Sequence, residues 1–114
     1  MDFEYKCITS NNLMILSMKG KIGRSSKDAL FKSLEEISKD ASKHILILFK
    51  DVTNVELAAT RDLALLQQEI RKTKKLYLVG LNKELKAMLL EKGIIREKEL
   101  RNSLEEALKT LDTN

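Results

Sequence analysis

The stretch that most constrains the fold is His44–Phe49, which reads HILILF and contains five consecutive apolar residues. A strand that is apolar on both faces has to be covered on both faces, as happens in sheets packed between helices. We therefore expect this run to form the buried centre of a sheet. The segment Leu76–Val79 (LYLV) has the same character and predicts a second buried strand.

Segments with helical spacing of apolar residues flank these strands. After a polar connection at Gly20–Ser26, Ser25 offers an N-cap and Asp28 follows three positions later, which predicts a helix running to about Ser42. Its inward stripe is expected to be Leu30, Leu34, Ile37 and Ala41.

Three more helices are predicted further along the chain. A loop at Asp51–Glu56 precedes the second, Asn82 caps the third, which Gly93 stops after about Lys92, and Ser103–Leu111 forms the last. The expected inward residues are Ala59, Leu63, Leu66 and Ile70, then Leu85, Met88 and Leu89, and finally Leu104, Ala107, Leu108 and Leu111.

The amino-terminal part predicts a hairpin. Phe3–Ile8 alternates apolar and polar residues, Ser10–Asn12 is a turn cluster, and Leu13–Met18 is nearly continuously apolar. Ile94–Ile95 is the candidate for a short last strand. The order of elements predicts an α/β fold with a mixed sheet of four to five strands, antiparallel only at the first strand, packed with about four helices.

Composition narrows the possible functions. The single cysteine, Cys7, excludes an intrachain disulfide, and with one histidine, His44, there is little material for a zinc site or a catalytic triad. No phosphate-binding glycine loop is present. We expect both residues to be structural and the protein to have no enzymatic activity, cofactor or metal. The lack of a signal peptide or a membrane-length apolar run predicts a cytoplasmic protein without membrane insertion.

The element order and one loop in particular resemble the STAS domain, the fold of bacterial anti-sigma factor antagonists. The resemblance implies a single STAS-like domain over residues 1–114 that binds a protein partner and regulates transcription. It is carried by Met18–Ile22, the helix from Lys27, Ile45–Leu48, the loop Val52–Thr60, Leu78–Leu81 followed by Leu85 and Leu89–Leu90, and Ser103–Leu108.

The resemblance also implies where regulation should act. In the family, the loop before the second helix typically reads aspartate-serine-serine-glycine, and a partner kinase phosphorylates the second small residue. The matching segment here is Glu56–Ala59 (ELAA). Ala58 has no hydroxyl and cannot accept a phosphoryl group, while Glu56 keeps the acidic character and Ala59 replaces the glycine.

A second departure lies in the loop after the hairpin. The family often carries an aspartate near the phosphorylated serine, and the matching position here is Gly23. A shifted alignment would make Thr60, Ser25 or Ser26 the acceptor, with Thr60 favoured because it lies near the same helix N-terminus.

By resemblance, the partner-binding surface combines these two loops. Leu57 is either an exposed apolar anchor for a partner or a residue that tucks into the core. The predicted surface residues are Gly23, Arg24, Ser25, Ser26, Val55, Glu56, Leu57, Ala58, Thr60 and Arg61.

Three functions remain open on this basis. The first is a non-enzymatic regulator that binds an anti-sigma factor or a related kinase-like protein without a phospho-switch at Ala58. The second is an accessory subunit of an ABC transporter ATPase or of a stressosome-type assembly. The third and least favoured is nucleic-acid binding through Lys19, Lys21, Arg24 and Lys27 or through Arg71–Lys75, since a net charge of +4 spread among glutamates is typical of a solvated surface.

Overall fold

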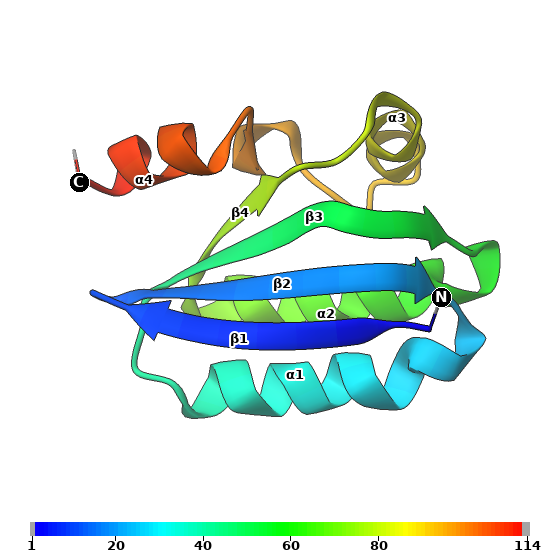
Figure 1. The fold of residues 1–114 in the computed structure, drawn as a ribbon, viewed down its shortest axis with the longest axis horizontal. Coiled ribbons are helices and arrows are strands. Elements are labelled where there is room, and N and C mark those ends of the chain that lie inside the picture. Colours follow the sequence, from blue (N-terminus) through cyan, green and yellow to red (C-terminus); the bar gives the residue numbers. More distant parts are fainter. Residues whose placement is uncertain (1, 113–114) are drawn as a thin grey trace.

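The computed structural model describes residues 2–112, which form a five-stranded sheet with helices on both faces (Figure 1). No helix in this range is both long and apolar enough to cross a membrane. The elements are β1 (Glu4–Ser10), β2 (Leu13–Ile22), η1 (Arg24–Ser26), α1 (Lys27–Lys39), β3 (His44–Val55), η2 (Leu57–Ala59), α2 (Thr60–Thr73), β4 (Lys75–Val79), α3 (Lys83–Glu91), η3 (Glu97–Glu99), β5 (Leu100–Arg101) and α4 (Leu104–Asp112).

The strands lie in the order β1-β2-β3-β4-β5, and only the β1–β2 pair is antiparallel. This confirms the predicted fold class. Each pair of consecutive parallel strands is joined by one crossover helix, α1, α2 or α3, and the two strands lie side by side. The apolar run from His44 lies in the central strand, as expected.

Two apolar clusters fill the space on either side of the sheet. The larger one joins Ile45 and Ile47 of β3 to α1, α2 and α3, and the smaller one joins Leu46 to Ala107 of α4. Successive residues of β3 therefore face opposite clusters, as strand geometry requires. The predicted core residues of the second helix are all buried: Ala59 at the end of η2, and Leu63, Leu66 and Ile70 in α2.

The two central strands are longer than the sequence predicts. β2 continues through the expected connection to Ile22, and β3 continues through the expected Asp51–Glu56 loop to Val55. The register between them shifts at Ser17/Lys19 and again at Gly20/Lys21, with an extra residue on β3 each time. These bulges disrupt the alternation of buried and exposed side chains, so the second half of β3 looks like a polar loop in the sequence.

The start of α1 differs from the prediction, because Ser25 does not cap it. Gly23 precedes a short 3-10 turn, and the buried Ser26 Oγ accepts the Gly23 N–H at 2.9 Å. The helix ends at Lys39 rather than at Ser42, which leaves Ala41 exposed. Ser33, which is not among the predicted core residues, is buried, and its hydroxyl donates to the Leu30 carbonyl oxygen at 2.6 Å.

Ile94 and Ile95 do not form the last strand, which is Leu100–Arg101 instead. Both isoleucines are buried, and their N–H groups donate to the Leu89 carbonyl oxygen at 2.9 and 3.4 Å. They follow Gly93, whose φ of 69° ends α3 in the left-handed conformation, as the sequence predicted.

The predicted inward face of α4 is only partly correct. Ala107 is fully buried and Leu111 contacts the smaller cluster, but Leu104 is 37% exposed and Leu108 is 40% exposed.

Candidate partner-binding site

The two loops singled out in the sequence begin side by side at the carboxyl ends of β2 and β3. Ile22 pairs with Val55, and the Glu56 N–H donates to the Ile22 carbonyl oxygen at 2.8 Å. In Figure 1 the turn after β2 and the turn after β3 lie at the same end of the sheet. We call residues 21–26 and 55–61 the loop pair.

Backbone and side-chain hydrogen bonds fix the first loop. The Ser26 N–H donates to the Gly23 carbonyl oxygen at 2.9 Å, and the Ser26 hydroxyl donates to the Lys21 carbonyl oxygen at 3.4 Å. Together with the bond that it accepts from Gly23, this makes Ser26 a structural residue of the turn. Arg24 and Ser25 are the exposed residues of the turn.

The Glu56 carboxylate joins the two loops. A Cβ added to Gly23 would lie 2.0 Å from Glu56 Oε1, so the acid occupies the space that a side chain at position 23 would need. Glu56 Oε2 also lies 3.3 Å from Lys21 Nζ. The acid beside Gly23 is therefore supplied by the second loop.

The second loop presents an apolar residue to solvent. Leu57 is 71% exposed, so it does not tuck into the core. Ala58 is exposed beside it, whereas Ala59 is fully buried under the start of α2. A short 3-10 turn, in which the Ala59 N–H donates to the Glu56 carbonyl oxygen at 2.9 Å, sets these three neighbours at different depths.

All ten predicted surface residues lie in the loop pair, but some of them are buried. Arg24, Ser25, Leu57, Ala58 and Arg61 are exposed, and Glu56 and Thr60 are partly exposed. The buried ones are Gly23, Ser26 and Val55. The exposed part of the site therefore combines the apolar side chains of Leu57 and Ala58 with the polar residue Ser25 and two arginines.

The alternative phosphoacceptors differ in accessibility. Ser26 is only 2% exposed and its hydroxyl is engaged, as described above. The Thr60 hydroxyl is partly exposed and donates to the Leu57 carbonyl oxygen at 2.8 Å, while Ser25 is exposed.

Cys7 and His44 lie outside the loop pair. Burial, together with the carboxylates of Glu36 and Asp40, raises the pKa of the Cys7 thiol to about 11, so it is held as the unreactive thiol at neutral pH. Burial, then the charges of Lys75 and Lys43, lower the pKa of His44. Within residues 2–112, no three His, Cys, Asp or Glu side chains are grouped so that they could hold a metal ion.

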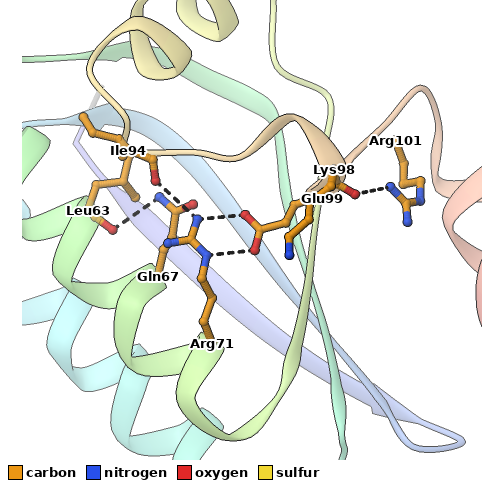
Figure 2. A network of polar contacts seen from close by, with 7 residues as sticks. All are labelled: Leu63, Gln67, Arg71, Ile94, Lys98, Glu99 and Arg101. Atoms are coloured by element: carbon orange, nitrogen blue, oxygen red, sulfur yellow. Dashed lines mark hydrogen bonds and ion pairs between the residues drawn. The ribbon is translucent and has the colours of Figure 1, made fainter.

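The basic stretch Arg71–Lys75 is largely engaged in structural contacts. Arg71 donates from Nε and Nη2 to the two carboxylate oxygens of Glu99 at 2.8 and 2.7 Å, and from Nη2 to the Ile94 carbonyl oxygen at 3.4 Å (Figure 2). The Lys74 ammonium donates to the Asp40 and Ser42 carbonyl oxygens. Nothing in the sequence predicts Glu99 as the partner of Arg71, because the two residues are 28 positions apart in the chain.

Three solved structures share this fold at low sequence identity. An anti-sigma factor antagonist from Mycobacterium paratuberculosis is 15% identical with a TM-score of 0.81, over 97% of this chain and 95% of that one. The anti-sigma factor antagonist SpoIIAA in its unphosphorylated form is 10% identical with a TM-score of 0.76, over 97% and 98%. A sulfate transporter family protein from Wolinella succinogenes is 19% identical with a TM-score of 0.78, over 93% and 89%.

No curated protein matches the sequence. The model of the STAS domain matches residues 5–107, which includes every strand and both loops described above apart from the first residue of β1. The chain therefore belongs to the STAS domain family.

Proposed function

We propose that this protein is a non-enzymatic regulator of the anti-sigma factor antagonist type, which binds an anti-sigma factor or a related kinase-like protein through the loop pair. It acts in the cytoplasm of a bacterial cell and regulates transcription through that partner. The family membership and the solved antagonists of the same fold support this class of function.

The observation that carries the proposal is the exposure of Leu57. A leucine that is 71% exposed gains little from its position in the free protein, because most of its apolar area stays in water. Apolar side chains that become buried at the centre of an interface contribute much of its binding energy. Leu57 lies between Glu56 and Ala58, so a partner docked on the loop pair would cover it.

The second part of the proposal is that docking lacks covalent control at position 58. A phosphoryl group adds a charge of about −2 at neutral pH and changes what a surface can bind. Ala58 is exposed at the same end of the sheet but offers only a methyl group. Binding would then depend on the amounts of the two proteins rather than on a kinase and a phosphatase.

The test is to capture the partner from the source organism with the tagged chain, identify it by mass spectrometry, and measure its affinity by calorimetry. Leu57→Asp should weaken binding by at least about thirtyfold, equivalent to a hot-spot loss of about 2 kcal/mol. Leu108→Asp is the matched control, since it places the same charge on another exposed leucine, on α4. If Leu57→Asp binds as well as this control, the loop pair is not the docking site.

A second candidate is association with a transporter, supported by the fold shared with the sulfate transporter family protein. In that case the captured partner would be a transporter subunit or its ATPase. The same Leu57→Asp variant then tests whether the loop pair is the surface used.

A further inference from the structure

A second basic region lies at the other end of the sheet from the loop pair. It is a cleft of about 450 Å³ beside the start of β4, which we call the basic cleft. Its lining residues are Arg71, Lys74, Lys75, Leu76, Tyr77, Arg96, Lys98, Glu99 and Arg101. A volume of this size is in the range of clefts that bind small molecules, about 300–1,000 Å³.

The formal charge of the protein is concentrated here. Six cations and one carboxylate line the cleft, which gives +5, whereas the whole chain carries +4. The rest of the molecule therefore has a formal charge of −1. A cleft lined by one sign of charge raises the local concentration of oppositely charged ligands.

Three of the six cations are held by contacts within the fold. Arg71 is bound by Glu99, and Lys74 by the two carbonyl oxygens described above. Arg101 donates to the Lys98 carbonyl oxygen at 2.9 Å (Figure 2). It also donates to the carbonyl oxygen of its neighbour Leu100 at 2.8 Å, and its guanidinium lies 5.1 Å from the centre of the Tyr77 ring.

The other three, Lys75, Arg96 and Lys98, are exposed and form no ion pair with any residue in the range 2–112. They come from β4, from the connection before η3 and from η3 itself. Glu99, the one acid of the cleft, is buried and already satisfied by Arg71, so it does not neutralise them. Three exposed cations that line one cleft without a carboxylate partner are suited to an anion with several charged oxygens.

The sheet leaves an open edge at the same place. β5 pairs only with Leu78 and Val79, so residues 75–77 of β4 have no strand on that side. The Lys75 N–H donates toward β3, to the Lys43 carbonyl oxygen at 2.9 Å. Because backbone groups alternate along a strand, those of Leu76 are directed toward the cleft, where the N–H can donate to an anion.

The cleft offers no platform for stacking a base. Its one aromatic residue, Tyr77, is buried, and its ring contacts Arg101 and His44. Proteins that bind single-stranded nucleic acid stack bases on exposed aromatic rings. The groups available for binding are therefore charged side chains and a backbone N–H donor. These groups recognise the phosphates of a ligand and not the rest of the ligand molecule.

We propose that the basic cleft binds a small anion carrying two or more phosphate groups. The ligand is a free polyphosphate or a small molecule with clustered phosphates, since both present the same oxygens. The site is separate from the loop pair: the cleft lies beside the first residues of β3, whereas the loop pair begins at the opposite end of that strand, where Ile22 pairs with Val55. The proposal therefore stands whether or not the proposed partner is correct.

The test is calorimetric titration of the full chain with inorganic tripolyphosphate. Lys75→Gln combined with Lys98→Gln should weaken binding by about tenfold, from the loss of two partly exposed ionic contacts. Lys83→Gln combined with Lys86→Gln removes the same charge from the exposed face of α3 and should leave the affinity within about twofold. Equal losses in the two double variants, or no binding to the natural chain, would overturn the proposal.

Two comparisons test the ligand class. ATP should bind no more tightly than tripolyphosphate, since the cleft has no exposed aromatic face for the base. Single-stranded DNA should bind more weakly than tripolyphosphate at the same ionic strength. Much tighter binding of either would contradict recognition through phosphate groups alone.

The single histidine gives a second readout that does not depend on affinity. His44 pairs with Lys75 across β3 and β4, and the charges of Lys75 and Lys43 add to burial in lowering its pKa, while its Nδ1 lies 3.4 Å from the Tyr77 hydroxyl. An anion bound beside Lys75 offsets one of these charges, so the pKa of His44 followed by NMR should rise at saturating tripolyphosphate. An unchanged pKa would place the anion elsewhere.

Discussion

The loop pair and the basic cleft each contain an ion pair, and the two pairs differ in how they are held. Lys21 and Glu56 are 3.3 Å apart with side chains that are 51% and 40% exposed, whereas Arg71 and Glu99 form a two-bond contact with side chains that are only 13% and 8% exposed. Exposed pairs contribute little to stability, and breaking a buried pair is strongly destabilising.

This difference separates the charged residues that stabilise the fold from those that are available to bind a partner or ligand. The buried pair connects α2 to η3, next to the short strand β5, and so holds the carboxy-terminal part against the rest. The cations around it can then face solvent without disturbing the core. At the loop pair, the exposed pair and the exposed Leu57 can both be covered by a partner with little change in the stability of the fold.

The largest expected effect is that of breaking the buried pair. Glu99→Gln leaves the Arg71 guanidinium mostly buried without its carboxylate, which should lower the free energy of unfolding by about 3 kcal/mol. Glu56→Gln should lower it by less than about 1 kcal/mol. Urea unfolding of both variants measures these two changes in the free energy of unfolding. Equal decreases would show that the two ion pairs contribute equally to stability.

A smaller effect is expected from two glycines that differ in what surrounds them. Gly80 has a φ of +87°, and an added Cβ would lie 2.7 Å from the Lys50 backbone nitrogen, so Gly80→Ala should cost about 2 kcal/mol. At Gly23 the obstacle is the end of the flexible Glu56 side chain, which can move away. Gly23→Ala should therefore cost less than about 1 kcal/mol in the same assay, and a larger loss would mean that the loop pair is rigid.

Neighbouring alanines of the loop pair give a third contrast. Ala59 is fully buried, so Ala59→Leu would overpack the start of α2 and cost about 1–3 kcal/mol. Ala58 is exposed, and Ala58→Leu should change stability by no more than about 0.5 kcal/mol. Thermal unfolding distinguishes the two, and a large loss at position 58 would show that it is not a free surface position.

The smallest expected effect is the pH dependence of the free energy of unfolding, which involves His44 at the start of β3. The pKa of His44 is lowered in the folded state from its usual 6.5, so the unfolded chain binds the proton more readily as the pH falls. Stability should therefore decrease below about pH 6.5, and His44→Gln should flatten the profile between pH 7 and 5. If the stability of His44→Gln falls between pH 7 and 5 as steeply as that of the natural chain, other titrating groups cause the loss of stability.

Much of the fold follows from local pattern, as α2 shows. Leu63, Leu66 and Ile70 recur at helical spacing and all are buried. The pattern fails where the register shifts: Phe49, Val52 and Val55 are buried at every third position, because β3 carries extra residues opposite β2. A strand with a period of three resembles neither a regular strand nor a helix in the sequence.

The sequence predicts which residues form the loops of the candidate site, but not how deeply each residue is buried. The sequence placed Leu57, Ala58 and Ala59 in one loop, but their different burial depends on a 3-10 turn that has no sequence signal of its own. The approach of Glu56 to Gly23 and the pairing of Arg71 with Glu99 both join segments far apart in the chain. Such contacts arise from the packing of elements and cannot be read from neighbouring residues.

The central claim is that the partner docks on the loop pair without covalent control, and intact mass measurement tests it most directly. The natural chain and Ala58→Ser are incubated with ATP and the captured kinase-like partner, and each product is weighed. We predict no mass gain for the natural chain and a gain of one phosphoryl group for Ala58→Ser. A phosphoryl group on the natural chain, mapped to Thr60 or Ser25 and abolishing partner binding, would contradict it.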